Sequence, residues 1–258
     1  MRVGVFDSGL GGLTVVRALQ EHIKGLEIIY VADTAHAPYG EKTHDQIRTF
    51  SDTITRYLID HHRIEALVVA CNTATSAAIA YLRKTFPDLI IVGTEPGVKP
   101  ALTHTTTHKI GILATPATLA GDKYQELVDA LVPRDGVELY EQACPGLVEQ
   151  IEAGEIDAPE TRAMLEGWLS PMREAGVDTI VLGCTHYPLA AGAIERVMGY
   201  RVTLIETGGA IARRLRSLMV LPKGSKANRV SIFVTGTIDR QAVRRIVGER
   251  VDVEVVSI

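Results

Sequence analysis

The stretch Val68-Val69-Ala70-Cys71-Asn72-Thr73 decides the fold: an apolar run ends in a cysteine followed by two small hydrogen-bonding residues. A similar stretch, Val181-Leu182-Gly183-Cys184-Thr185-His186, lies in the second half of the chain. Each predicts a buried strand that leads through a cysteine into a helix. Residues 3–8 and 110–115 resemble each other more weakly. These repeats predict two related halves.

Short apolar runs alternate with helical patterns along the whole chain. The expected strands are Val3–Phe6, Ile28–Val31, Leu67–Ala70, Leu89–Val92, Ile110–Ala114, Val137–Tyr140, Thr179–Leu182, Val202–Ile205, Val230–Val234 and Val253–Val256. The expected helices are Leu13–His22, Asp45–His62, Thr75–Lys84, Leu119–Leu131, Pro159–Ala175 and Ala210–Met219, with a short helical stretch at Leu147–Ala153. Continuous apolar strands that alternate with helices are typical of parallel sheets covered on both faces. We therefore expect an α/β protein.

Two seams divide the chain. One is Glu95-Pro96-Gly97-Val98-Lys99-Pro100, and the other is Thr207-Gly208-Gly209. They predict a discontinuous first domain, residues 1–97 plus 208–258, and a second domain, residues 98–207. Because the two halves repeat, we expect these domains to be similar, each with a doubly wound sheet, and to be related by pseudo-two-fold symmetry. Ligands of open α/β sheets bind beyond the carboxyl ends of the strands, so we expect the active site in the cleft between the domains.

The composition narrows the class of protein. The chain has 258 residues, of which 46% are hydrophobic and 22% charged, as in ordinary globular proteins. With 27 Lys and Arg against 31 Asp and Glu the net charge is −4, and no basic block points to nucleic acid. No apolar run suits a membrane helix, and Val3–Phe6 follows Met1 too closely for a signal peptide. The three cysteines fit free thiols in a reducing cytoplasm. A homodimer is the default assembly.

The turn Asp7-Ser8-Gly9-Leu10-Gly11-Gly12 follows the first expected strand and has two interpretations. It resembles a dinucleotide fingerprint, but the third glycine of that motif is missing and Asp7 would repel a pyrophosphate. A glycine turn that brings backbone N–H groups to a small ligand fits better. Asp7 would then meet a ligand ammonium or hold a reactive group. A helix N-cap is the structural alternative for Asp7.

The two cysteine turns carry the chemistry. A helix N-terminus lowers the pKa of a thiol, so Cys71 and Cys184 suit reactive thiolates better than buried apolar filler. A metal site of Cys71, Cys184 and His186 lacks any C-x-x-C or H-x-x-x-H pair to pre-form it. Cys144, in Ala143-Cys144-Pro145, has no polar turn residues beside it and is interpreted as structural.

Two thiols on opposite sides of a tetrahedral carbon can remove a proton from one face and return one to the other. That is racemisation or epimerisation by general acid–base catalysis, and a thiol pKa of about 8.5 suits it near neutral pH. No nicotinamide, flavin, pyridoxal or metal requirement is visible. Neutral donors for the substrate carboxylate are expected in the turns around the thiols: Ser8, Tyr39, Gly40, Asn72, Thr73 and Thr185, with Thr115 and Thr118 as weaker candidates. By itself Glu152 looks like a surface residue, and His186 is equally compatible with a core histidine.

These motifs occur together in a known family. The matching segments are Asp7–Gly12, Pro38-Tyr39-Gly40-Glu41-Lys42, Cys71-Asn72-Thr73-Ala74-Thr75, Glu95-Pro96-Gly97, Ala114-Thr115-Pro116-Ala117-Thr118 and Gly183-Cys184-Thr185-His186-Tyr187-Pro188-Leu189. They run in family order over nearly the whole chain. The chain thus resembles the glutamate racemases, cofactor-independent amino-acid racemases of bacterial cell-wall synthesis.

The resemblance implies specific roles. Cys71 faces the proton of the D-enantiomer and Cys184 that of the L-enantiomer. Asp7 assists Cys71, while Glu152 and His186 assist Cys184. Substrate contacts are expected from the same turns: Asp7, Ser8, Pro38, Tyr39, Gly40, Asn72, Thr73, Thr75, Thr115, Thr118, Thr185 and His186.

The chain departs from the family pattern at three places. His36 stands where the family usually has an arginine, Glu206-Thr207-Gly208 stands for an Asp-Ser-Gly, and the Gly146-Leu147 stretch before Glu152 is atypical. Two alternatives stay open on the sequence. One is a racemase or isomerase of another small acid, such as aspartate, a hydantoin or maleate. The other is a non-catalytic dicarboxylate-binding protein.

Overall fold

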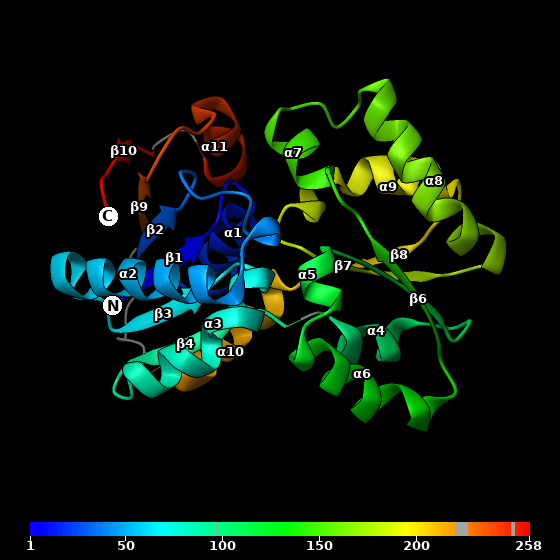
Figure 1. Ribbon diagram of the computed structural model, residues 1–258, viewed down its shortest axis with the longest axis horizontal. Helices are drawn as coiled ribbons and strands as arrows, with labels where there is room; N and C mark the ends of the chain where they lie inside the picture. Colours follow the sequence, from blue (N-terminus) through cyan, green and yellow to red (C-terminus); the bar gives the residue numbers. More distant parts are fainter. Residues whose placement is uncertain (96, 220–226, 249–250) are drawn as a thin grey trace. The chain divides into compact units, whose positions relative to one another are not determined.

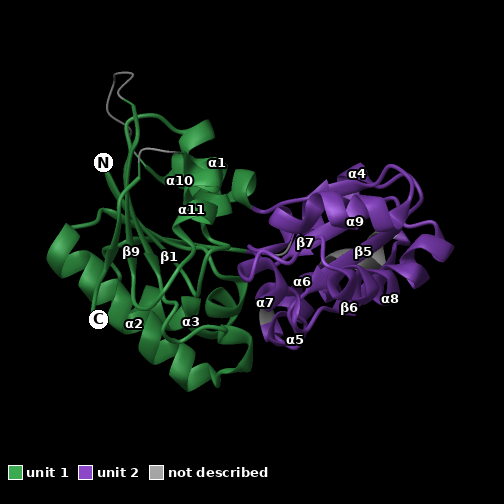
Figure 2. Ribbon diagram, turned by 90° about the horizontal axis from the view of Figure 1, so that it is seen from above, with its two compact units in different colours: residues 1–94, 208–258 green, residues 95–207 purple. Residues whose placement is uncertain are grey.

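The computed structural model describes residues 1–95, 97–219, 227–248 and 251–258, so Pro96 of the expected seam lies outside the described residues. The chain divides into two compact units, Met1–Thr94 with Gly208–Ile258, and Glu95–Thr207 (Figure 2). The expected boundaries were 97/98 and 207/208. Each unit is a parallel sheet with helices, which confirms the α/β class.

The first unit is built on a sheet with the strand order β10-β9-β2-β1-β3-β4 (Figure 1). All of its described strand pairs are parallel. In β1, residues Val3 to Asp7 are buried, because the strand lies between two neighbours and under helices on both faces. The strands are β1 (Arg2–Asp7), β2 (Glu27–Ala32), β3 (Ala66–Val69), β4 (Ile90–Gly93), β9 (Arg229–Val234) and β10 (Val253–Val255).

Helices cover both faces of this sheet. Helix α1 packs on α10 and α11, while α2 packs on α3, and the two groups lie on opposite sides of the strands (Figure 2). Helix α2 begins at a capping box in which Thr43 and Gln46 exchange hydrogen bonds. The elements are α1 (Leu13–His22), the 3-10 helix η1 (Tyr39–Glu41), α2 (His44–His62), α3 (Asn72–Thr85), α10 (Gly208–Leu218) and α11 (Arg240–Val247).

The second unit has the strand order β6-β5-β7-β8, again with parallel pairs. Alternate residues of β7 point to opposite faces. Ile180 and Leu182 join the core under α8 and α9, whereas Val181 joins the core under α4 and α6. The strands are β5 (Lys109–Ala114), β6 (Glu138–Ala143), β7 (Thr179–Gly183) and β8 (Thr203–Ile205). The helices are α4 (Val98–His104), α5 (Pro116–Leu119), α6 (Asp122–Asp135), α7 (Leu147–Glu152), α8 (Pro159–Ala175), η2 (Tyr187–Ala190) and α9 (Ala191–Met198).

The weak sequence repeat corresponds to a repeat of topology. The order β2-β1-β3-β4 in one unit matches β6-β5-β7-β8 in the other, so β1 corresponds to β5 and β3 to β7. In each unit the sheet grows first to one side and then to the other. The carboxyl ends of β1 and β3, and of β5 and β7, therefore flank a topological switch point, where such sheets bind ligands.

Every expected strand is present, but the helices differ in part. The helix expected at Leu119–Leu131 is two helices, α5 and α6, separated at Ala120–Gly121. Helices α4, α9 and α11 were not expected. Helix α4 was not predicted because its first residues, including Pro100, belong to the expected seam. Proline is tolerated in the first turn of a helix, and that is where Pro100 lies. Helix α11 is short and buries only Val243 among its residues, so its apolar pattern is faint.

Asp178 ties the start of β7 to the loop before β5. Its carboxylate accepts hydrogen bonds from the hydroxyl groups of Thr105 and Thr106 and from the N–H groups of Thr106 and Thr107, at 2.7–2.9 Å. Partial burial acts to raise the pKa of this carboxyl, but the hydrogen bonds outweigh it and hold the pKa well below its usual range. The ionised form is thus the one that the fold stabilises.

We predict that Asp178→Asn lowers the free energy of unfolding by about 2 kcal/mol at pH 7, because one amide oxygen replaces two charged acceptors. A lowered folded-state pKa adds stability above the unfolded value of about 3.9, and this is lost as pH falls further. The gap between wild type and variant should therefore be constant above about pH 5 and narrow below pH 4 in urea titrations. The exposed Asp88→Asn is the control; an equal effect there would contradict the assignment.

Candidate active site

The first thiol lies at the switch point of the first unit. Phe6 of β1 pairs with Val69 of β3, and the N–H of Ala70 donates to the Phe6 carbonyl at 2.8 Å. This pairing sets Asp7 and Ser8 beside Cys71, with 4.0 Å between the Ser8 Oγ and Cys71 Sγ atoms. All of these side chains are buried. The structure thus places Asp7 and Ser8 at the strand end next to the one that leads into Cys71.

Cys71 is the N-cap of α3. Its sulfur accepts a hydrogen bond from the Ala74 N–H at 3.4 Å, and the buried residues Asn72 and Thr73 form the first turn of the helix. The N-terminal end of a helix carries partial positive charge and unsatisfied N–H groups. This position therefore stabilises negative charge on the sulfur, as the sequence predicted for Cys71.

The glycine turn folds onto Asp7. The Gly12 N–H donates to Asp7 Oδ2 at 2.6 Å, and the Tyr30 hydroxyl donates to the Gly9 carbonyl at 2.5 Å. A Cβ at Gly12 would lie 2.5 Å from Asp7 Cβ and 2.7 Å from the Tyr30 hydroxyl, so only glycine fits. Because the Gly12 N–H is directed at the carboxylate, this turn does not form the phosphate cradle of a dinucleotide site.

The Tyr39 hydroxyl is used inside the protein. It donates to Asp33 Oδ2 at 2.6 Å, and the ring is buried. Burial, and then the negative charge of Asp33, raise the pKa of Tyr39 well above its ordinary value, so the hydroxyl keeps its proton. The hydroxyl hydrogen that the sequence assigned to a ligand is directed at Asp33 in this structure. The Pro38–Gly40 turn can offer instead the N–H groups of Tyr39 and Gly40, which start η1 and so lack intrahelical acceptors.

Thr75 likewise has a structural role. Its hydroxyl lies 3.2 Å from the Val69 carbonyl and 3.0 Å from the Thr94 hydroxyl, and it accepts the Thr94 N–H at 3.1 Å. These bonds join α3 to the ends of β3 and β4. The Thr75 hydroxyl, which was expected at a ligand, thus has internal partners in this structure.

The second thiol lies at the switch point of the second unit. Ala114 of β5 pairs with Gly183 of β7, so Thr115 and Cys184 follow neighbouring strand ends. Cys184 opens a turn closed by the Tyr187 N–H at 3.2 Å, and the short helix η2 follows. Cys184 is thus not the N-cap of an α-helix, and the expected likeness to Cys71 stops at the strand end.

An imidazole and a carboxylate stand behind Cys184 instead. His186 Nδ1 lies 3.8 Å from Cys184 Sγ, and His186 Nε2 lies 2.8 Å from Glu152 Oε1. An ionised carboxylate only accepts hydrogen bonds, so it selects the tautomer that carries hydrogen on Nε2. Nδ1 then presents its lone pair to Cys184. This chain of contacts suits proton movement between the thiol and the imidazole.

Gly146 explains how Glu152 reaches His186. Its backbone is left-handed, with φ of 82°, and it is the N-cap of α7. Glycine adopts this conformation without strain. The atypical Gly146-Leu147 stretch therefore starts the helix that carries Glu152, and the structure places Glu152 and His186 together.

Thr115 and Thr118 form a cap at the start of α5. The Thr115 hydroxyl accepts the Thr118 N–H at 3.3 Å, and the two hydroxyl oxygens lie 2.9 Å apart. The buried Thr185 follows Cys184 directly. These three side chains surround the carboxyl ends of β5 and β7, where the sequence predicted neutral donors.

Cys144 differs from the other two thiols. Burial, and then the nearby charge of Cys184, raise its pKa to about 12, and its sulfur lies 3.5 Å from the Gln142 carbonyl, to which it donates. A thiol with so high a pKa is almost fully protonated at neutral pH, so almost no thiolate is present to accept a proton. The structural interpretation of Cys144 fits these values.

Asp33 was not among the expected site residues, although its position directly after β2 was a usable signal. In the described part of the chain, every helix is too short or too polar to span a membrane. Within those same residues, His, Cys, Asp and Glu side chains form no group of three or more arranged to hold a metal ion.

Comparison with known proteins agrees with this geometry. Residues 8–215 match the Asp/Glu/Hydantoin racemase family. A glutamate racemase of Sulfurovum sp. (strain NBC37-1) is 59% identical over 96% of this chain and 95% of its own length. The Escherichia coli glutamate racemase, solved with L-glutamate and the activator UDP-MurNAc-ala, is 30% identical and superimposes with a TM-score of 0.86 over 99% and 98% of the two chains. The Francisella tularensis glutamate racemase, solved with D-glutamate, is 26% identical, with a TM-score of 0.83 over 100% and 97%. The chain belongs to the Asp/Glu/Hydantoin racemase family.

Proposed function

We propose that this protein is a glutamate racemase that interconverts L- and D-glutamate without a cofactor. The observation that carries the proposal is the pair of thiols, Cys71 and Cys184, at equivalent strand ends of a repeated topology. Each thiol has its own polar partners. The substrate class is supported by relatives that share more than half of their residues with this chain.

The reaction uses one thiolate and one thiol. With L-glutamate, the Cys184 thiolate takes the Cα proton and leaves its electron pair on Cα as a carbanion, which is delocalised into the carboxylate. The Cys71 thiol then donates its proton to the opposite face, giving D-glutamate and a Cys71 thiolate. The reverse reaction exchanges the roles, so no net proton or electron is consumed.

The two sides are activated differently. His186, oriented by Glu152, shares the proton of Cys184, whereas Cys71 has the N-terminal end of α3 and the neighbouring Asp7 and Ser8. The developing carbanion needs hydrogen-bond donors at the substrate carboxylate. We assign this task to Asn72, Thr73, Thr185, Thr115, Thr118 and the N–H groups of the Pro38–Gly40 turn.

The wider setting is part of the same proposal. D-Glutamate made in this way supplies bacterial peptidoglycan synthesis. Three free thiols suit the cytoplasm, since its reducing conditions keep them available. We propose a homodimer as the working assembly, which light scattering of the purified protein would test.

We predict that Cys71→Ser and Cys184→Ser each reduce glutamate racemisation at least about a thousandfold, because a serine hydroxyl is too weak an acid to replace the thiol. Circular dichroism can follow L- and D-glutamate without added pyridoxal phosphate and with a chelator. Cys144→Ser is the matched control, a buried cysteine of the same unit as Cys184 to which the mechanism gives no step, and should keep wild-type rates. Full activity in either of the first two variants refutes the two-thiol mechanism. Turnover of aspartate or a hydantoin in place of glutamate would show that the substrate is a different small acid. Binding of glutamate without turnover would show that this is a binding protein.

We predict that Glu152→Gln lowers kcat about 10- to 100-fold, because a glutamine amide can donate to Nε2 and turn a protonated Nδ1 toward Cys184. Only the Cys184 proton transfer should slow. The kinetic isotope effect with α-deuterated L-glutamate should therefore rise, and that with α-deuterated D-glutamate should fall. Glu149→Gln changes an exposed carboxylate on the same helix and is the control. Equal isotope effects in both directions would contradict a role confined to Cys184.

A further inference from the structure

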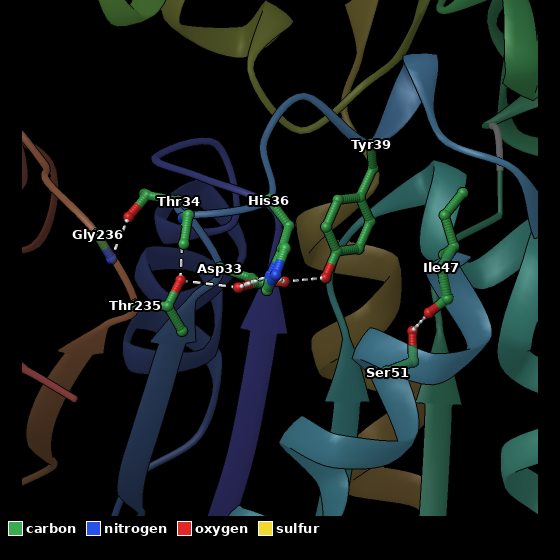
Figure 3. Close-up of polar contacts among 9 residues, drawn as sticks. Asp33, Thr34, His36, Tyr39, Ile47, Ser51, Thr235 and Gly236 are labelled. Atoms are coloured by element: carbon green, nitrogen blue, oxygen red, sulfur yellow. Dashed lines mark hydrogen bonds and ion pairs between the residues drawn. The ribbon is translucent and has the colours of Figure 1, made fainter. Parts of the chain in front are cut away.

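Asp33 is a buried carboxylate that binds three parts of the first unit. It is 1% exposed and follows β2. Its oxygens accept the Tyr39 hydroxyl at 2.6 Å and the Thr235 hydroxyl at 2.7 Å, and His36 Nδ1 lies 2.9 Å away (Figure 3). Tyr39 belongs to the Pro38–Gly40 turn, whereas Thr235 follows β9, near the end of the chain. One side chain thus joins a site turn to a distant segment.

A second pair of bonds fixes the same junction. Thr235 Oγ1 accepts the Ala35 N–H at 3.0 Å. The Gly236 N–H donates to Thr34 Oγ1 at 3.0 Å (Figure 3). A Cβ at Gly236 would lie 3.1 Å from Ala35 N, so the two segments approach closely. Because the Thr235 hydroxyl accepts from Ala35, its own hydrogen is directed to Asp33. The 33–36 loop is therefore held from the end of β9.

The Tyr39 ring connects this junction to the thiol. It packs in the same buried cluster as Phe6, Ile47 and Cys71. The Phe50 ring lies 5.8 Å from the Tyr39 ring between centroids, and His36 stacks on Phe50 at 3.9 Å. The ring cannot shift without disturbing either the Asp33 bond or the packing around Cys71.

From these contacts we infer that Asp33 and Thr235 are positioning residues for the substrate-binding turn Pro38-Tyr39-Gly40, acting through the Tyr39 hydroxyl. The inference rests on the proposed function, because it assigns a substrate carboxylate to the N–H groups of this turn. Burial of a carboxylate is expensive, and an apolar pair can close a loop at lower cost. The carboxylate supplies a directed anchor for Tyr39 and leaves the backbone of residues 39 and 40 to face the ligand.

The decisive variant is Thr235→Val, which keeps the side-chain shape and removes the hydroxyl. The loop before the turn then loses both hydrogen bonds of the Thr235 hydroxyl, to Asp33 and from the Ala35 N–H, and both enantiomers should bind more weakly. Carboxylate binding is shared by ground state and transition state, so KM should rise about tenfold for L- and D-glutamate while kcat stays within about twofold. Thr235→Ser restores the hydroxyl and should restore KM.

Two more variants separate positioning from general stability. Tyr39→Phe removes the second hydroxyl that donates to Asp33. Its double variant with Thr235→Val should raise KM by less than the product of the two single effects, because both hydroxyl groups act through Asp33. Ser51→Ala is the matched control: Ser51 is buried in α2 and donates to the Ile47 carbonyl at 2.7 Å (Figure 3). It should leave KM unchanged.

A binding measurement keeps this test independent of turnover. Calorimetry with D-glutamate should show about a tenfold weaker Kd for Thr235→Val. Unchanged KM and Kd in a folded Thr235→Val, or a failed rescue by Thr235→Ser, would overturn the inference and leave a purely structural tie. A wild-type protein that binds glutamate but does not racemise it would refute the proposed function, while the Kd shift would still support the positioning role. No glutamate binding at all would overturn both.

Discussion

Parallel strands bring their carboxyl ends to one edge of a sheet, and the chemistry of this protein depends on that constraint. Where the sheet changes its direction of growth, two neighbouring strand ends face outward without a covering connection. Each unit uses this position for a cysteine: Cys71 after β3, beside the end of β1, and Cys184 after β7, beside the end of β5. Because the topology is repeated, each unit has a cysteine at the equivalent strand end. The apolar strands that form the core of each unit thus also position its thiol.

The surroundings of the two thiols are not copies of each other. Cys71 receives an N–H from the first turn of α3, whereas Cys184 lies before a 3-10 turn and depends on His186 and Glu152. Helix geometry supplies fixed partial charge in the first case, whereas in the proposed mechanism the imidazole of His186 supplies a proton acceptor in the second. Cys144 shows the contrast within one unit, because burial raises its pKa to about 12. A racemase must take a proton from either face, and two different supports can serve two mirror-image substrates.

Much of this could be predicted from the sequence because the signals are local. Buried strands such as Thr179–Gly183 are continuous apolar runs, and polar residues directly after them mark strand ends. Helix α4 escaped prediction because Pro100 resembles a break, and only packing shows that it lies in a first turn. Tyr39 was assigned to the ligand because its hydroxyl partner, Asp33, is set by tertiary structure. The tie of Asp33 to Thr235 joins residues far apart in sequence, and no local pattern contains it.

The most direct test of the two-thiol account is the fate of the label when L-glutamate reacts in D2O, followed by NMR and chiral separation early in the reaction. With two bases on opposite faces, the base that protonates the product has exchanged its proton with solvent. The base that removed the substrate proton returns that same proton when the reaction reverses. The account predicts that D-glutamate carries deuterium at Cα from the first turnovers, while the remaining L-glutamate stays unlabelled. D-Glutamate that retains its hydrogen, or L-glutamate that gains deuterium as fast as product forms, would show a single base and contradict the central claim.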